Sequence, residues 1–401
     1  MHFVFFGESP VNETGASRVS KYLLQAIVES GHTVEVIGTN HFIEDNYDHE
    51  QFPFPITGVS MPTKLETYQK AIEIIKDKES DYVFINDDMH VPQIMIDILT
   101  SRPCIALGAI DGEVHFKEQV NSFSHATIPA VYSKHAYQSV LKVIPELAQK
   151  LQCVQLGCEP DTFFPVNEEV RKAYRKKCFG IDDETFLVMN VNRNQVRKDL
   201  ARSMKAFSLF NQKYPNSKLY MLTQRRDVGG DLISQARLIG CNLSTMFFTG
   251  DDYNALAGYD REKLNLMYNS ADVCISTAQG EGWGLTTTEA LTAGRPFIGP
   301  NNTSFIEILS PDRGYLVQSG GDDLWSVYYG TDDAPRPLTS VTDMVRTLEY
   351  VYHHREEAKQ KGLNGRKWAE SHTWSQFKDR WKEILWHAQS LLESQGKMVA
   401  I

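Results

Sequence analysis

Residues 279–291 read QGEGWGLTTTEAL, and this stretch carries the strongest structural signal in the chain. It follows an apolar run that ends near Ser276, and it leads into a short helical pattern that stops at Gly294. Its glycines let the backbone approach a ligand closely, and they lie beside two carboxylates, Glu281 and Glu289. Ligands of open α/β sheets bind outside the carboxyl ends of strands, where such a loop lies. The stretch therefore predicts a strand, a glycine loop with a ligand site, and a helix.

The residues of this loop suit different parts of one ligand. The first helical turn, near Leu285, lacks a strong Ser, Asp or Asn cap, so its amides are open to an anion such as a diphosphate. Glu289 falls one turn inside the helix, where a carboxylate can accept hydrogen bonds from a ribose diol. Glu281 lies on the loop itself, nearer the chemistry. A tight turn with two solvated glutamates is the alternative, but the spacing of the two carboxylates favours a ligand site.

Short apolar runs alternate with helical patterns on both sides of this loop. The predicted strands are 2–6, 33–38, 82–86, 104–108 and 152–156 in the first half, and 185–192, 218–222, 272–276 and 296–299 in the second. The predicted helices include 16–29, 65–76, 91–99 and 134–142 in the first half, and 200–212, 261–269 and 286–293 in the second. Such alternation is typical of parallel sheets covered by helices on both faces. The fold class is therefore α/β, with two doubly wound, Rossmann-like domains. The pattern breaks at 160–169, which divides the chain into domains 1–168 and 169–374, and residues 338–395 are almost entirely helical in pattern.

Length and charge narrow the classes of function. The 401 residues exceed what one core usually supports, which agrees with two domains. A formal charge of −10 argues against a nucleic-acid partner, and it gives no general attraction to an anionic membrane. No apolar run is long enough for a transmembrane segment, the N-terminus lacks a signal-peptide pattern, and six scattered cysteines fit a reducing compartment. We expect a cytoplasmic protein for which a local membrane contact and the oligomeric state stay open.

A second constellation supports an anionic ligand. Residues 192–199, NRNQVRKD, follow the first strand of the second half. A fixed arginine and lysine at the end of a strand, here Arg193 and Lys198, suit two phosphates. Arg197 is less clear and is expected to be solvated. An exposed basic loop is the alternative.

The 281–289 segment resembles the donor-site motif of retaining glycosyltransferases of the GT-B fold, often called family 4. That motif has two glutamates separated by seven residues, flanked by Gly-Phe-Gly-Leu and Glu-Ala, and here Trp283 replaces the usual phenylalanine. The resemblance implies that Glu289 binds the ribose hydroxyls, that Glu281 contacts the transferring sugar, and that loop amides meet the sugar and phosphates. It implies the following donor-binding residues: Gly15, Arg193, Lys198, Glu281, Gly282, Trp283, Gly284, Leu285, Thr286 and Glu289.

The resemblance extends over nearly the whole chain. It implies the GT-B architecture, in which two Rossmann-like domains face a central cleft, the first on the acceptor side and the second holding the donor. Gly15 is the one glycine left of the family's Gly-Gly pair, and a plain helix start is its alternative reading. Trp374 matches a tryptophan that starts the final helices, which implies that the helix 375–401 packs back on the first domain.

Two acidic or polar loops complete the candidate residues. Asp111 and His115 follow a strand of the first domain, in a loop that often faces the acceptor in the family, so either can orient an acceptor hydroxyl. The pairs Asp87-Asp88 and Asp251-Asp252 raise the question of a metal, but no further ligand clusters with them. We expect solvated acidic loops, no metal and no cofactor besides the donor substrate.

The predicted function is transfer of a hexose from a nucleoside-diphosphate sugar to a hydroxyl of a glycan or small-molecule acceptor, with retention at the anomeric carbon. A stretch like 192–198 occurs in some mannosyltransferases, which makes GDP-mannose the first expectation for the donor. A non-catalytic sugar-nucleotide-binding protein of the same fold is the alternative. A dinucleotide-dependent enzyme is not expected, because the segment from Gly7 to Gly15 lacks the Gly-x-Gly-x-x-Gly pattern.

Overall fold

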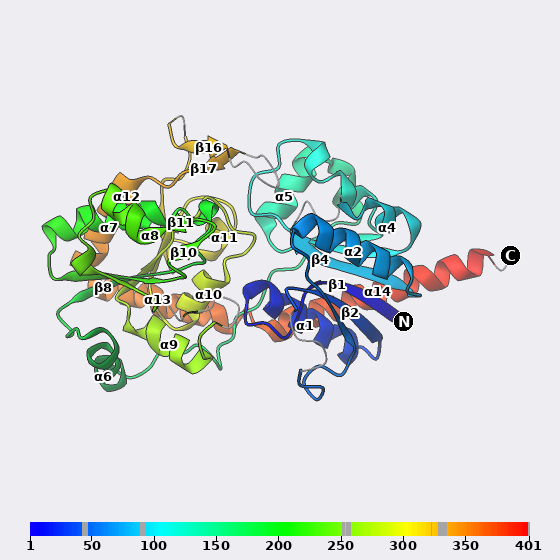
Figure 1. The fold of residues 1–401 in the computed structure, drawn as a ribbon, viewed down its shortest axis with the longest axis horizontal. Coiled ribbons are helices and arrows are strands. Elements are labelled where there is room, and N and C mark those ends of the chain that lie inside the picture. The colour runs from blue at the N-terminus through cyan, green and yellow to red at the C-terminus, as the bar shows by residue number, and fades with distance from the viewer. Residues whose placement is uncertain are drawn as a thin grey trace. The chain divides into compact units, whose positions relative to one another are not determined.

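A computed structural model describes residues 1–41, 47–88, 94–250, 253, 258–321, 323–327 and 335–399. The chain forms two compact units (Figure 1). Unit 1 combines Met1–Gly157 with Trp374–Ile401, and unit 2 is Cys158–Thr373. The predicted α/β class, with two doubly wound parallel sheets, is confirmed.

Unit 1 is built on a seven-stranded parallel sheet in the order β3-β2-β1-β4-β5-β6-β7. Its strands are β1 (His2–Glu8), β2 (Thr33–Thr39), β3 (Ile56–Val59), β4 (Tyr82–Asp88), β5 (Cys104–Ala109), β6 (Ile128–Val131) and β7 (Gln152–Cys153). Its helices are α1 (Gly15–Glu29), α2 (Lys64–Lys76), α4 (Ile96–Ser101), α5 (Lys134–Val143) and α14 (Trp374–Val399), with short 3-10 turns at Lys117–Gln119, Asn121–Ser124 and Pro145–Gln149. Of the predicted helix at 91–99, residues 91–93 lie outside the described part of the chain.

Strand β1 shows why this sheet is covered on both faces. Its side chains alternate between two sides, as in any strand, and both sides are apolar. Val4 and Phe6 join the core formed with α2, α4 and α5. Phe5 contacts Phe84 of β4, whose ring packs against Trp381 of α14 on the other side. A strand that is apolar on both sides can lie only in the middle of a layered α/β unit.

Unit 2 is built on a six-stranded parallel sheet in the order β12-β9-β8-β13-β14-β15. Its strands are β8 (Phe186–Val191), β9 (Ser217–Leu222), β12 (Met246–Phe248), β13 (Val273–Ile275), β14 (Phe297–Pro300) and β15 (Tyr315–Val317), with small hairpins β10–β11 (Arg226–Asp227, Gly230–Asp231) and β16–β17 (Trp325–Val327, Pro335–Pro337). Its helices are α6 (Glu168–Phe179), α7 (Leu200–Lys213), α8 (Leu232–Leu238), α9 (Arg261–Ser270), α10 (Leu285–Thr292), α11 (Phe305–Ile308), α12 (Val341–His353) and α13 (Arg355–Glu370), with 3-10 turns η4 (Val196–Lys198) and η5 (Leu243–Thr245).

In both sheets, the direction in which successive strands are added reverses once, at the first strand of the unit. In unit 1 the chain first builds outward from β1 to β3 and then crosses to β4 on the opposite side of β1. In unit 2 it builds from β8 to β12 and then crosses to β13 on the opposite side of β8. The two central strands of each sheet therefore mark a topological switch point, and open α/β sheets bind their ligands at the carboxyl edge beside such a point.

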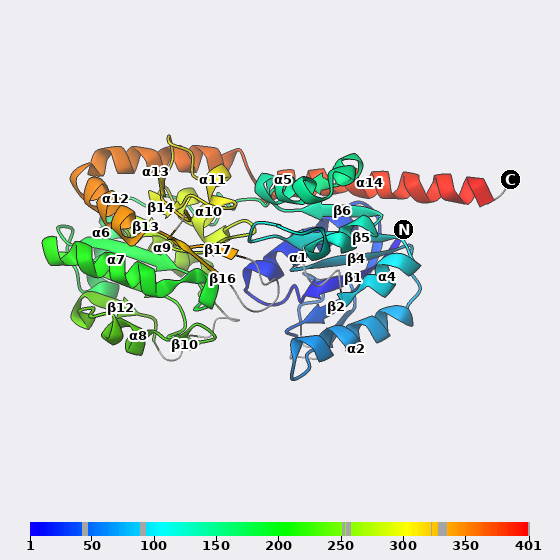
Figure 2. The same cartoon turned by 90° about the horizontal axis from the view of Figure 1, so that it is seen from above.

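The two units divide at 157–158, whereas the sequence pattern changes at 168–169. The difference arises because the backbone before α6 is held by α9: the amides of Phe164 and Val166 donate to the side-chain oxygens of Asn265 and Asn269. The chain returns to unit 1 through α14, which runs along that unit as one long helix (Figure 2). No helix in the described ranges is long and apolar enough to cross a membrane.

Candidate functional site

The loops after β8 and β13 lie side by side at the carboxyl edge of the unit 2 sheet. The two strands are neighbours, with Val188 opposite Val273 and Met189 opposite Cys274. The loop after β8 carries residues 192–199, and the loop after β13 carries residues 276–284. A backbone hydrogen bond of 2.7 Å from the Gln279 amide to the Arg197 carbonyl joins them. The two motifs that the sequence singles out are thus in direct contact.

Helix α10 begins on a glycine that leaves its first turn open. Gly284 is the N-cap residue, with φ +99°, a backbone conformation that side-chain-bearing residues rarely adopt. It has no side chain to accept hydrogen bonds from the first-turn amides, and it brings no acidic group to that turn. A helix N-terminus of this kind favours an anion.

Glu281 is buried and is held by two cations from η4. Its Oε1 forms an ion pair with the ammonium of Lys198, which is itself buried. Its Oε2 lies 3.4 Å from Nη1 of Arg197, and the same Nη1 donates to the Gly280 carbonyl at 2.9 Å. Each carboxylate oxygen therefore faces a different cation, and Arg197, which we expected to be solvated, takes part in the cluster.

Two hydroxyl groups from the loop after β14 hold the backbone of the glycine loop in place. The Glu281 amide donates to Oγ1 of Thr303 at 3.0 Å. The Ser304 hydroxyl is positioned to donate to the carbonyls of Glu281 and Trp283, at 3.0 and 2.6 Å. Thr303 has φ +42°, so its own backbone is strained to present this side chain. The sequence analysis missed both residues, because a Thr-Ser pair after a strand carries no distinctive spacing.

Glu289 is buried inside α10 and is supported by a tyrosine of α9. The Tyr268 hydroxyl donates to Oε2 of Glu289 at 2.7 Å. Tyr268 is fully buried, and its ring packs edge-on against Phe163. The carboxylate is thereby fixed in one orientation on the face of α10.

Arg193 lies in the same loop as Lys198 but pairs elsewhere. Its Nε lies 2.7 Å from Oδ2 of Asp227, on the β10–β11 hairpin, and its side chain is about half exposed. Asn194 ties the loop to that hairpin as well, since its Nδ2 donates to the carbonyls of Arg225 and Gly230. The described contacts therefore bring Lys198 to Glu281, and they bring Arg193 to the hairpin.

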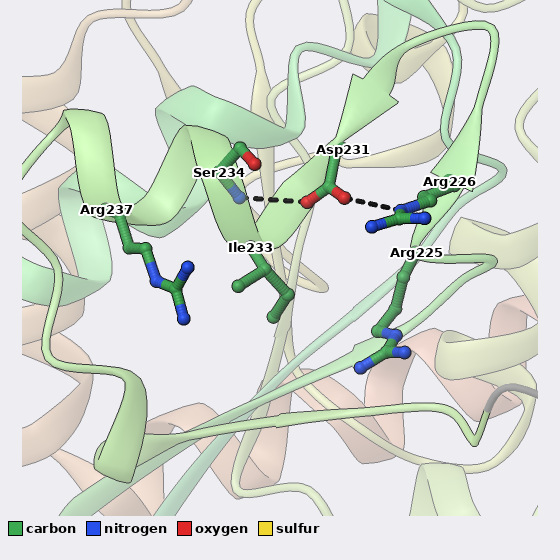
Figure 3. Close-up of a pocket in the computed structure, with 6 residues that line it drawn as sticks. All are labelled: Arg225, Arg226, Asp231, Ile233, Ser234 and Arg237. Atoms are coloured by element: carbon green, nitrogen blue, oxygen red, sulfur yellow. Dashed lines mark hydrogen bonds and ion pairs between the residues drawn. The ribbon is translucent and has the colours of Figure 1, made fainter.

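A pocket of about 270 Å³ lies on the hairpin side of this loop (Figure 3). Its lining residues are Arg225, Arg226, Asp231, Ile233, Ser234 and Arg237. Asp231 accepts from the Ser234 amide and pairs with Arg226 at 2.6 Å, and these contacts lower the pKa of its carboxyl to about 2. Three guanidinium groups against one carboxylate make the lining basic, and none of these residues belongs to the glycine loop.

In unit 1, the residue predicted from the first loop is Gly15, which follows β1. Gly15 is the first residue of α1, and the helix is capped by Thr14, whose hydroxyl accepts from the Ser17 amide at 3.1 Å. The cap leaves Gly15 in the plain helix-start position that the sequence analysis considered as its alternative. The loop also lies at the switch point between β1 and β4.

Asp111 and His115 follow β5 in the same unit. Asp111 is partly buried, and His115 is exposed, with its amide donating to the Gln119 side chain at 2.8 Å. Between them, the Val114 amide donates to the Ser139 hydroxyl at 2.7 Å, which ties the loop to α5. The loop is thus ordered, and the two side chains stay candidates for the acceptor.

Asp87 and Asp88 are the last two residues of strand β4, where Asp88 is exposed to solvent as expected. Asp87 is partly buried, and burial together with the negative charge of Asp88 raises the pKa of its carboxyl to about 7. Among the residues that the structure describes, no group of three or more His, Cys, Asp or Glu could hold a metal ion. Asp251 and Asp252 lie outside the described residues.

Comparison with known proteins finds a family model that matches part of unit 2. A model of the family described as glycosyl transferases group 1 matches residues 171–326, which include both loops of the site. Trehalose synthase of Pyrococcus horikoshii is 24% identical over 159 residues, 38% of this chain and 36% of that protein. The chain thus matches only about a third of the length of this curated relative.

Solved structures share the fold over nearly the whole chain at low identity. Sucrose-phosphate synthase from Thermosynechococcus elongatus has a TM-score of 0.72 at 13% identity, covering 98% of this chain and 100% of that one. HepE from Anabaena, solved in complex with UDP-glucose, has a TM-score of 0.68 at 13% identity, covering 96% and 99%. Residues 171–326 therefore belong to the glycosyl transferases group 1, and the chain as a whole has the GT-B fold.

Proposed function

We propose that the chain is a retaining glycosyltransferase that moves a hexose from a nucleoside-diphosphate sugar to a hydroxyl of a glycan or other acceptor. The observation that carries the proposal is the cluster of Lys198, Arg197 and Glu281 beside the open first turn of α10. Cations and free helix amides at the switch point of a doubly wound sheet suit a diphosphate. The family match over residues 171–326 supports the same reading.

In the proposed reaction, the acceptor oxygen forms a bond to the anomeric carbon while the bond from that carbon to the β-phosphate oxygen breaks. Negative charge develops on the departing diphosphate. Lys198 and the first-turn amides of α10 stabilise this charge, and such preorganised groups contribute most in the transition state. Arg193 joins them in the proposed reaction by exchanging Asp227, its partner on the hairpin, for the diphosphate. We assign the ribose to Glu289 and the transferring sugar to Glu281. The leaving phosphate accepts the proton of the acceptor hydroxyl, on the face from which it departs.

Two experiments identify the base and the sugar of the donor. Our first expectation, GDP-mannose, rests on the resemblance of residues 192–198 to some mannosyltransferases, whereas the Anabaena structure holds UDP-glucose. Thermal shift with GDP, UDP and ADP separates the candidates, because a ligand that binds only the folded state raises the melting temperature. Binding of none of the three would contradict the proposal. Hydrolysis of a panel of sugar donors then identifies the sugar.

The alternative is a sugar-nucleotide-binding protein without catalysis. It predicts the same thermal shift but no transfer and no donor hydrolysis. On the acceptor side, which we assign to unit 1, Asp111 and His115 are the candidates to orient the acceptor hydroxyl. A glycan acceptor array with the identified donor tests this part. If Asp111→Asn and His115→Gln change neither KM for the acceptor nor turnover, these residues have no such role.

A further inference from the structure

We propose that Glu281 is an internal counter-ion that competes with the donor diphosphate for Lys198, and that Arg197 keeps Glu281 neutralised when Lys198 turns to the phosphate. This inference rests on the proposed function and concerns the regulation of the same site. It assigns a role to Arg197, which the sequence motif left without one.

The first step is the position of Lys198. Its ammonium lies against Oε1 of Glu281, and both side chains are about nine-tenths buried. An ammonium is a compact charge on a flexible stem, so it can turn between two neighbouring anions. A diphosphate at the amino end of α10 would offer Lys198 a second anionic partner close to the first. The carboxylate and the diphosphate therefore compete for one cation.

The second step is the charge that remains on Glu281. A buried carboxylate without a neighbouring cation has a high free energy, and the negative charge of a nearby diphosphate raises that free energy further. Arg197 prevents this, because its Nη1 lies 3.4 Å from Oε2, whereas the ion pair of Lys198 is with Oε1. Its hydrogen bond to the Gly280 carbonyl holds the guanidinium in place independently of Lys198. A planar guanidinium fixed by two acceptors is suited to stay where the lysine moves.

Replacing the Glu281 carboxylate by a neutral amide of the same shape tests whether the carboxylate opposes diphosphate binding. Glu281→Gln should bind the preferred nucleoside diphosphate more tightly than the wild-type protein, by about 3- to 10-fold, because Lys198 no longer has to leave an anion. The affinity for the corresponding nucleoside, which has no phosphate, should not change. The same variant should lose transfer activity, because Glu281 is assigned to the sugar. Calorimetric titration with whichever of GDP, UDP and ADP binds best measures both affinities.

A double-mutant cycle tests the role of Arg197. In the wild-type background, Arg197→Met should weaken diphosphate binding by about 3- to 10-fold, because Glu281 then holds Lys198 alone. In the Glu281→Gln background, the same change should have less than about 2-fold effect, because there is no carboxylate left to neutralise. Arg226→Met and Glu349→Gln, which each remove one member of an exposed ion pair in the same unit, serve as controls.

The outcomes separate the two proposals. A wild-type protein that binds none of the three diphosphates contradicts the proposed function itself. A wild-type protein that binds, with Glu281→Gln equal to it or weaker, overturns the counter-ion role and leaves the function standing. An equal effect of Arg197→Met in both backgrounds overturns the role of Arg197. If Glu281→Gln does not fold, Glu281→Asp replaces it, because the shorter carboxylate withdraws from Lys198 and should give a smaller gain of the same sign.

Discussion

Tyr268 is the residue whose contact makes the ribose role of Glu289 testable. Its hydroxyl donates to the carboxylate at 2.7 Å from a fully buried position. Tyr268→Phe removes this hydrogen bond and leaves the ring in place. A bond to a charged acceptor is worth about 1.5–3 kcal/mol, so a partial loss of positioning should weaken nucleoside diphosphate binding by about 3- to 10-fold. We expect Glu289→Ala to weaken it more.

The readout that distinguishes positioning from general damage is the ribose hydroxyl. The wild-type protein should bind the preferred diphosphate more tightly than its 2′-deoxy analogue, and Tyr268→Phe should reduce that preference. Tyr82→Phe is the matched control, because Tyr82 is also buried and donates to the Ala388 carbonyl at 3.0 Å in unit 1. An unchanged preference in Tyr268→Phe, or an equal loss in Tyr82→Phe, would remove the positioning role.

Asp87 should make stability depend on pH. Burial, then the charge of Asp88, raises its pKa from 3.8 to about 7, so the folded state binds a proton more tightly than the unfolded state. Stability from this group is present in acid and is lost as the pH rises from about 4 to 7. Asp87→Asn should flatten the melting temperature over that window and raise it at pH 8 by a few degrees, on the order expected for 1 kcal/mol. Asp379→Asn, at an exposed position, should leave the profile unchanged, and identical profiles for all three proteins would contradict the assignment.

At the scale of single residues, the charged residues of the two motifs could be predicted from the sequence, but not all of their contact partners could. Lys198 and Glu281 stood out because each sits in a dense motif after a strand, and the structure brings them together. Arg197 and Tyr268 did not stand out. A cation beside another cation resembles a solvated loop, and a tyrosine at an apolar helix position resembles core. Only the three-dimensional contact shows that each of them meets a motif carboxylate.

Helix α10 is held by a close contact with α13 that only glycine allows. A Cβ at Gly362 would lie 2.3 Å from the carbonyl oxygen of Gly294, at the end of α10. Gly362→Ala should gain about 1 kcal/mol of helix propensity, yet overpacking against backbone costs about 1–3 kcal/mol. We expect a net loss of stability in urea denaturation and, because α10 carries Glu289, weaker nucleotide binding. Lys367→Ala, on the exposed side of α13, is the control. A more stable Gly362→Ala protein would show that the two helices separate easily.

Several long elements could be predicted from the sequence, and several short ones could not. The twelve-residue helix α6 was missed, whereas the short strands β13 and β14 were expected at 272–276 and 296–299. Helices α1, α7 and α9 were expected within one residue of their observed bounds, because their apolar positions repeat over several turns. Strands β3, β6, β12 and β15 were missed. Each has four residues or fewer, and β6 contains a proline, Pro129, so neither alternation nor composition marks it. These strands lie at or next to the sheet edges, so missing them did not change the prediction of the central strands or of the site.

At the scale of the whole molecule, the chain order and the folding units do not coincide. Unit 1 is completed by α14, although the residues before Trp374 belong to unit 2. Trp374 stacks on Tyr22 of α1 with ring centroids 4.3 Å apart. Trp381 is fully buried against Phe84 of β4. Helix α14 therefore supplies part of the core of unit 1, and the stability of that core depends on a segment more than two hundred residues after Gly157 in sequence.

Two tryptophans on α14 test this dependence within one helix. Trp381 is fully buried, whereas Trp386 is 73% exposed. Trp381→Ala should cost about 3–5 kcal/mol, since it removes the largest buried side chain beneath the sheet, and Trp386→Ala should cost less than about 0.5 kcal/mol. Amide hydrogen exchange should show which elements lose stability. In Trp381→Ala, protection should decrease in β1, β4 and α1, while β8, β13 and nucleotide binding stay unchanged. Equal destabilisation of both units would mean that they fold as one, and equal costs for the two tryptophans would mean that α14 contributes no core to unit 1.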